Sequence, residues 1–437
     1  MTGDVIARFE MALRRGIGRT ALMLRDDPTN GAFHAALLDA CKKVVSYDAQ
    51  CEDSRAPWLR GLIGIAGVER PFWRALVDHL GTFADDADSD DVAQVFDLLC
   101  RLAADAPDLD RTPLRNVVTR CAAGWDGFFG LGPDTFTPLV RLEGSDALSY
   151  IVDANFEVLR KVLETGDAHV FRWLIDALPA PDDAARAAMI EDARAKSSQL
   201  DRLLNMAATC KAWPTATPAP HPDYAALKAR DELAMIARPR WANDASPGDL
   251  ARAAADLLAE TDADRIFYLL RLFAWRDWPL EPRLLFPFVE TGTERICWQA
   301  TQTLGRLADP SVRALALVRL GADPAAAIHM LSGSCEQGDL DAIETAVRAA
   351  TFDEDQWHGV GTSLLHLLDR TGAPTRDAHE LLLLLYENTP CSLCRQGATA
   401  RLADAGLAPA WMRAECPFDS DQETAALFSA PPAEATI

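Results

Sequence analysis

One stretch decides the fold of this chain: Thr293-Glu-Arg-Ile-Cys-Trp-Gln-Ala-Thr-Gln-Thr-Leu-Gly-Arg-Leu-Ala-Asp-Pro-Ser-Val-Arg-Ala-Leu-Ala-Leu-Val-Arg-Leu320. Its first half repeats apolar residues at helical intervals, at Ile296, Ala300, Leu304 and Leu307. That spacing places them on one stripe of an α-helix. Asp309 then precedes Pro310, which indicates a new helix start: the aspartate can accept a hydrogen bond from a free backbone N–H, and proline has none to lose. The stretch predicts two amphipathic helices joined by a short turn.

The same helical pattern continues outside this stretch. Apolar stripes recur at Leu250, Ala254, Leu257 and Leu258, and at Ile266, Leu269, Leu270 and Phe273. Cap residues precede prolines at Asp27-Pro28, Ser246-Pro247, Asp323-Pro324 and Thr389-Pro390. No run alternates convincingly as a strand bounded by turn signals. We therefore expect an all-α chain of many short helices.

Short helices with one apolar face can bury that face only by stacking on neighbouring helices. The stretch 293–320 resembles the HEAT repeat, in which an Asp-Pro turn, a Val-Arg step and small residues recur in each unit. Only this unit matches well, and the chain has no clean fixed period. The resemblance implies an α-solenoid of divergent HEAT-like helix pairs. The alternative is an irregular all-α globule.

A proline-rich stretch divides the chain. Residues 213–222 contain four prolines and no apolar stripe, which predicts an extended linker or a long loop. We therefore expect an N-terminal helical repeat region over 1–212 and a C-terminal HEAT-like region over 223–430. The last residues, 431–437, are expected to form a disordered tail.

The charge of the chain excludes some function classes. It has 437 residues with 43 Lys+Arg against 65 Asp+Glu, and 43 − 65 gives a net charge of −22. This balance argues against nucleic-acid binding by general phosphate neutralisation, although a local arginine-lined groove would still be compatible with it. A hydrophobic content of 49 % is sufficient for a buried core.

Compartment signals favour a cytoplasmic protein. The N-terminus lacks the basic start and apolar stretch of a signal peptide. The longest apolar runs, near 61–68 and 381–386, are far short of the ~20 residues that span a bilayer. The ten cysteines are scattered, which is typical of reduced thiols rather than of a disulfide framework.

A polar connection, Tyr47-Asp-Ala-Gln-Cys-Glu-Asp-Ser-Arg55, is the first candidate site. Functional groups often lie in such connections. Asp48 and Glu52 could present paired carboxylates to a ligand and Arg55 a guanidinium fork. The candidate binding residues are Tyr47, Asp48, Gln50, Glu52 and Arg55. The favoured alternative is a capped turn in which Arg55 pairs with an acid.

A group of arginines near the N-terminus is the second candidate. The group consists of Arg8, Arg14, Arg15, Arg19 and Arg25. Arg14, Arg15 and Arg19 are the residues expected to receive an acidic partner or a phosphate. The favoured alternative is a solvated face that pairs with the carboxylates of the same chain.

Two closely spaced cysteines form the third candidate. Cys391 and Cys394 share a face in the first turn of a predicted helix, where the N-terminus favours thiolates. Cys416 and His379 could complete the four ligands that a structural zinc site needs. A redox pair would need a βαβ context, which this sequence lacks. Buried structural thiols are the favoured interpretation, and zinc is the one cofactor that remains open.

Three segments together resemble a group of bacterial HEAT-like helical repeat proteins of uncharacterised function. They are the segments Leu13–Arg25, Tyr47–Arg55 and Glu387–Arg395. The resemblance covers about thirty residues and implies only the helical repeat fold. It assigns no catalytic residue to the chain.

The sequence therefore predicts a non-catalytic helical-repeat scaffold that binds another protein through its concave face. Motifs of metalloproteases, serine hydrolases, kinases and deaminases are missing, which favours a scaffold over an enzyme. The acidic balance favours a partner with basic patches. An enzyme or small-ligand binder with its site at Tyr47–Arg55 is the first alternative. Nucleic-acid binding through an arginine-lined groove is the second.

Overall fold

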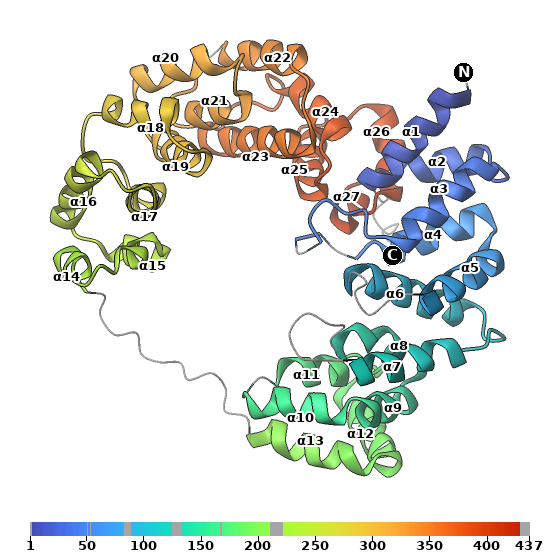
Figure 1. Cartoon of the computed structure of the whole chain (residues 1–437). Coiled ribbons are helices and arrows are strands. Elements are labelled where there is room, and N and C mark those ends of the chain that lie inside the picture. The colour runs from blue at the N-terminus through green and yellow to red at the C-terminus, as the bar shows by residue number, and fades with distance from the viewer. Residues whose placement is uncertain are drawn as a thin grey trace, which may run out of the picture. The chain divides into compact units, whose positions relative to one another are not determined.

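A computed structural model describes residues 2–49, 51–52, 54–82, 89–124, 133–166, 168–209, 222–336 and 338–428. Over these residues the chain forms α-helices and short 3-10 helices, and none of them belongs to a strand (Figure 1). The prediction of an all-α fold is confirmed. No helix among them is long and apolar enough to cross a membrane.

The chain divides into two compact units. Unit 1 comprises Met1–Thr215 and Ala410–Ile437, and unit 2 comprises Ala216–Pro409. The division after Thr215 falls in the proline-rich stretch 213–222, of which only Pro222 lies within the described residues. The boundary near the C-terminus differs from the expected one: the described residues 410–428 belong to unit 1, whereas the sequence placed residues 223–430 in one C-terminal region. The predicted tail 431–437 lies outside the described residues.

Unit 1 is built from helices of the first half of the chain and three short ones from its end. The first group is α1 Thr2–Arg15, α2 Arg19–Asp26, α3 Gly31–Lys42, α4 Ala56–Ala66, α5 Glu69–Thr82, α6 Ser89–Asp105, α7 Thr112–Gly124, η1 Pro133–Phe136, α8 Thr137–Glu143, α9 Ser145–Ala154, α10 Phe156–Glu164, α11 His169–Asp176, α12 Asp183–Lys196 and α13 Ser198–Thr209. The second group is α26 Ala410–Glu415, η4 Cys416–Phe418 and α27 Gln422–Ala426. The helix expected at Pro28 begins instead at Gly31, because the Asn30 side chain accepts from the N–H groups of Ala32 and Phe33.

Helix α6 organises the core of unit 1. It packs against α3, α4, α5, α7, η1 and α8. Its apolar residues extend round most of its circumference and are buried, at Val92, Val95, Phe96, Leu98, Leu99 and Leu102. Phe96 meets Phe136 edge to face, with ring centroids 5.4 Å apart. The buried positions of α6 extend over more than half of its circumference, with Asp97 and Arg101 on the remaining face, so several neighbouring helices are needed to cover them.

The C-terminal segment 410–428 packs onto the first helices of unit 1. Arg19 donates two hydrogen bonds to the Glu415 carboxylate, at 2.8 and 2.9 Å. Trp58 donates from Nε1 to the Phe418 carbonyl at 2.8 Å. Gly18 lies so close to the Glu415 backbone that a Cβ would stand 1.8 Å from its carbonyl oxygen. A residue without a side chain is therefore required where the two segments meet.

Unit 2 contains the remaining helices. They are α14 Tyr224–Ala229, η2 Leu233–Ala237, α15 Pro239–Asp244, α16 Pro247–Ala259, α17 Ala263–Trp275, η3 Pro282–Leu285, α18 Phe286–Thr291, α19 Glu294–Leu304, α20 Pro310–Arg319, α21 Pro324–Leu331, α22 Asp339–Ala349, α23 Glu354–Thr371, α24 His379–Asn388 and α25 Ser392–Asp404. Predicted caps are present at Ser246, Asp309 and Asp323, whose side chains accept from backbone N–H groups of the next turn. At Thr389-Pro390 the helix begins two residues later than expected, with Cys391 at its N-cap.

Alternate helices of unit 2 form a continuous row. Helix α17 packs on α19, α19 on α21, α21 on α23, and α23 on α25. Helices α16, α18, α20 and α24 each pack against the next member of that row (Figure 1). The two helices predicted in 293–320 both exist, as α19 and α20, but α20 packs mainly against α21. The buried residues of α20 are Val312 and Ala316, and the Asp309 turn that joins α19 to α20 does not make these two helices packing partners.

We expect Gly18→Ala to destabilise unit 1 and to loosen its C-terminal segment. The new methyl group would collide with the Glu415 carbonyl, and overpacking of this kind costs about 1–3 kcal/mol. The free energy of unfolding and the hydrogen exchange of residues 410–428 measure the effect. Gly31→Ala is the matched control, since a Cβ at Gly31 meets nothing within 4 Å. Equal behaviour of the two variants would contradict the close approach at Gly18.

Candidate functional site

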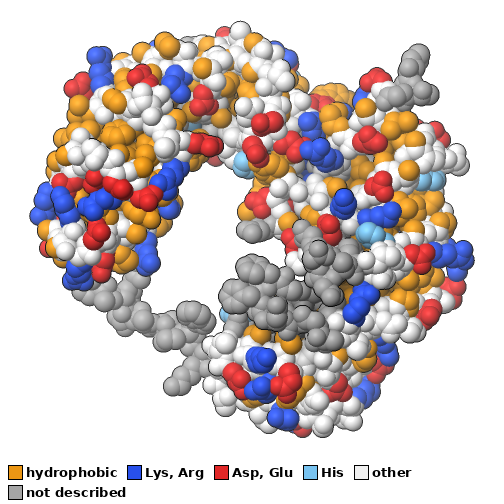
Figure 2. Space-filling view, viewed as in Figure 1, with side chains coloured by type: hydrophobic (Ala, Val, Ile, Leu, Met, Phe, Trp, Pro, Cys, Tyr) orange, Lys and Arg blue, Asp and Glu red, His pale blue; other side chains and the backbone are white. Residues whose placement is uncertain are grey.

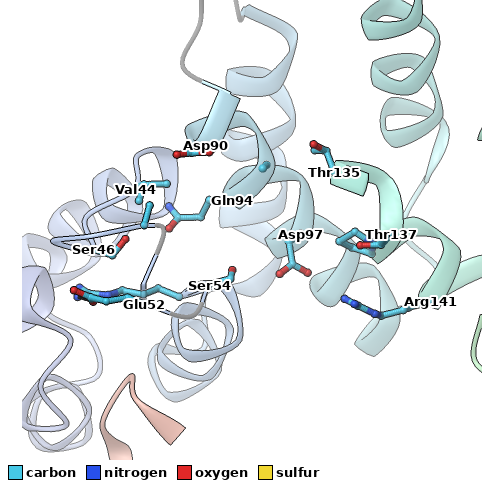
Figure 3. Close-up of a pocket in the computed structure, with 14 residues that line it drawn as sticks. Val44, Ser46, Glu52, Ser54, Asp90, Gln94, Asp97, Thr135, Thr137 and Arg141 are labelled. Atoms are coloured by element: carbon cyan, nitrogen blue, oxygen red, sulfur yellow. Dashed lines mark hydrogen bonds and ion pairs between the residues drawn. The ribbon is translucent and has the colours of Figure 1, made fainter. Parts of the chain in front are cut away.

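A pocket of about 310 Å³ lies in unit 1 beside the predicted polar connection. One side comes from the connection after α3, with Glu52 and Ser54 (Figure 3), and Arg55 also lines the pocket. Helix α6 adds Asp90, Gln94 and Asp97, and η1 and α8 close the opposite side. Arg141 of α8 lines this pocket and also a neighbouring one that contains Trp173. The connection therefore borders a cavity of ligand size, within the range of common ligand sites.

Glu52 and Arg55 are nevertheless engaged with each other. Arg55 donates from Nη2 to Glu52 Oε2 at 3.1 Å, and both side chains are 3 % exposed or less. A second guanidinium nitrogen donates to the Arg14 carbonyl. Glu52 also accepts from the Asp48 backbone N–H at 3.3 Å. These contacts form an internal brace between α1 and the connection. They include the pairing of Arg55 with an acid, but the next helix, α4, has Arg55 itself at its N-cap and no side-chain cap there.

Tyr47 and Asp48 do not join this pair in lining the pocket. Both are half-buried, and Gln50 lies outside the described residues. The sequence interpretation missed Gln94, which donates from Nε2 to the Lys43 carbonyl at 2.7 Å and to that of Ala40 at 3.1 Å. A polar residue within the apolar repeat of α6 was the available signal, since a buried amide needs partners.

The three candidate arginines have separate surroundings. Arg19 is committed to the Glu415 carboxylate and lies over the Trp411 ring at 5.6 Å. Arg14 lines a different pocket of about 300 Å³ that also contains Glu10 and Asp39. Arg15 is the half-buried last residue of α1. On the face drawn in Figure 2, acidic and basic side chains are interspersed over the described helices.

The cysteine pair has a partner that the sequence interpretation did not name. Cys391, Cys394 and His358 place their ligand atoms within 4.8 Å of one another. A hydrogen bond from Cys394, followed by one from His358, lowers the pKa of Cys391 to about 4. Cys416 belongs to unit 1. His379 contacts Glu380 and the Leu407 carbonyl, so neither proposed ligand joins this group.

A row of aromatic rings crosses three neighbouring members of the helix row of unit 2, namely α19, α21 and α23. Trp298 of α19 lies beside His329 of α21, with centroids 5.6 Å apart. His329 stacks on His366 of α23 at 4.9 Å and an interplanar angle of 7°. Trp298 is 39 % exposed, while His329 is buried. His366 is half-buried, so the buried His329 ring lies between two rings that are partly accessible to solvent.

The comparisons with known proteins identify no relative. No family model matches the chain, and neither a curated protein nor a solved structure matches it. The roles of individual residues are therefore inferred from their contacts, burial and chemistry.

Arg55→Met should destabilise unit 1 by about 3–5 kcal/mol, because it leaves the Glu52 carboxylate buried without its guanidinium. Adding Glu52→Gln should restore part of the loss, since the amide needs no counter-charge. Chemical denaturation measures both variants. Arg70→Met is the control: Arg70 pairs with Asp108 at 2.7 Å on the surface, and the substitution should leave stability nearly unchanged. An equal effect of Arg55→Met and Arg70→Met would disprove the brace.

His329 should make the stability of unit 2 depend on pH. Burial lowers the pKa of His329 to about 4, and the charges of His366 and Arg370 act in the same direction. The unfolded chain takes up this proton near pH 6.5 and the folded chain does not, so stability present above pH 6.5 is lost as the pH falls toward 4. The full loss is about 3 kcal/mol, and His329→Gln should remove it. If the free energy of unfolding varied with pH in the same way in the unaltered chain and in His329→Gln, this role of His329 would be contradicted.

Proposed function

We propose that this chain is a non-catalytic α-solenoid scaffold of divergent HEAT-like helix pairs that binds another protein. The observation that carries the proposal is the row α17–α19–α21–α23–α25 in unit 2. Stacked helices of this kind present an extended surface and need no active site. The described cysteines are free thiols, which supports the proposal of a cytoplasmic protein.

The ring row at Trp298 supports a binding surface on these helices. Tryptophan is enriched among the residues that dominate the binding energy of protein interfaces. Trp298 keeps more than a third of its surface exposed while its ring rests beside His329. An aromatic side chain held by a neighbouring ring loses little conformational freedom when a partner covers it. The ring is thus suited to anchor a partner.

Charge favours a partner with basic patches. The chain carries a net charge of −22, so a basic protein gains from long-range attraction before contact. Association of this kind slows as salt screens the charges over about 10 Å at 0.1 M. The same net charge weighs against nucleic acid as the partner.

A small-ligand binder or enzyme is the second candidate, favoured by the pocket of about 310 Å³ at Glu52 and Arg55. Its two central charges pair with each other, and Arg55 also holds the Arg14 carbonyl. A ligand would have to compete with these internal bonds. The protein-binding proposal needs no such exchange and is the one we favour.

Photo-crosslinking at position 298 tests the proposal. A photoreactive phenylalanine analogue in place of Trp298 should yield a discrete crosslinked protein in cells, and one in place of Trp173 should not. With that partner purified, Trp298→Ala should weaken its binding by at least ~10-fold, as expected of a tryptophan anchor. Titration calorimetry at two salt concentrations measures the affinity and its salt dependence.

Trp173→Ala is the matched control for the affinity measurement. Trp173 is 51 % exposed and belongs to unit 1, so its removal should leave the affinity unchanged within about twofold. Equal crosslinking at both positions, or equal loss of affinity in both alanine variants, would overturn the proposed surface.

A further inference from the structure

Three side chains with affinity for soft metal ions meet in unit 2, where α23 passes the start of α25. His358 lies in the second turn of α23. Cys391 is the N-cap of α25, and Cys394 lies in the first turn of that helix. Their ligand atoms all lie within 4.8 Å of one another. The fold thus brings His358 to a Cys-x-x-Cys motif whose cysteines follow it by 33 and 36 positions in the sequence.

The separations suit a tetrahedral zinc ion. Zinc–sulfur bonds of about 2.3 Å and zinc–nitrogen bonds of about 2.0–2.1 Å hold neighbouring ligand atoms roughly 3.5–3.8 Å apart. Cys394 Sγ lies 3.7 Å from His358 Nδ1. Thiolate and imidazole are the ligands that zinc takes most readily in proteins. Only small side-chain movements are needed to receive the ion.

The packing of α23 against α25 holds the three donors together. Gly361 lies on α23 one turn beyond His358, and a Cβ there would stand 3.2 Å from both Cβ and Sγ of Cys394. The glycine thus lets the two helices approach closely at the cysteine. Cys391 and Cys394 are each 3 % exposed, while His358 is half-buried. The group is therefore a preformed set of donors whose histidine side reaches toward solvent.

We propose that His358, Cys391 and Cys394 bind one zinc ion, with water or another small ligand in the fourth position. Within the described parts of the chain the donor group has three members, which is the number of protein ligands in zinc sites that keep an exchangeable position. Binding releases the remaining thiol protons to solvent, so two thiolates and a neutral imidazole face the ion. This proposal does not depend on the proposed protein-binding function.

Zinc content and affinity test the site directly. Full-length chain purified without chelator should carry about one zinc per molecule by elemental mass spectrometry. After removal of the metal, titration with zinc should restore it at the same stoichiometry, and cobalt should give the absorption bands of a tetrahedral thiolate complex. In the unaltered protein, zinc should protect Cys391 and Cys394 from alkylation, as read by peptide mass spectrometry. This last measurement needs no variant and no activity.

Variants separate the three ligands from the other cysteines and histidines. Cys394→Ser and His358→Asn should each weaken zinc affinity by more than about 100-fold, since even residues that only support a ligand contribute 10–100-fold. Cys335→Ser and His379→Asn are matched controls in the same unit and should bind like the unaltered chain. The proposal is overturned if the metal-free protein binds no zinc, if the ligand variants bind as tightly as the controls, or if freshly purified metal-free chain contains a Cys391–Cys394 disulfide.

Discussion

The burial of one apolar stripe on each short helix is the constraint on which the structure depends. No helix of this kind is stable alone in water, because its apolar face needs a neighbour and its length is below what isolated helices require. In unit 2 the solution is a row in which alternate helices pack on each other from α17 to α25. In unit 1 it is a cluster of helices round α6, whose buried residues contact neighbours on several sides.

The same packing also requires glycine at positions where two elements approach so closely that a Cβ would not fit. Gly18 lets the C-terminal segment pack on α2, so that residues from both ends of the chain share one core. Gly361 does the same for α23 and α25 and brings Cys394 beside His358. In both places a methyl group would separate elements that carry specific polar contacts. Packing geometry and the candidate chemistry are thus linked through single glycines.

Charged residues that look alike in the sequence have different environments in the structure. Arg19 and Arg55 are braces, each paired with a buried carboxylate. Trp298, by contrast, keeps its ring exposed beside the buried His329, which stacks on the half-buried His366. A guanidinium that is already paired offers less to a ligand, because binding must first break the internal pair. For this reason we propose the binding surface on the helix row of unit 2 and not at the arginines.

The sequence by itself determined the all-helical class and several helix starts, because periodicity and capping are local properties. Helices α19 and α20 and the caps at Ser246, Asp309 and Asp323 were predictable, whereas the starts expected at Pro28 and Pro390 occur later in the chain. It also identified Cys391 and Cys394 as a pair on one face. Only the tertiary structure decided that α20 packs on α21, that residues 410–428 return to unit 1, and that His358 completes the cysteine group. The second and third of these join residues far apart in the chain. The first, between helices adjacent in the sequence, depends on the relative rotation of packed helices, which no local pattern encodes.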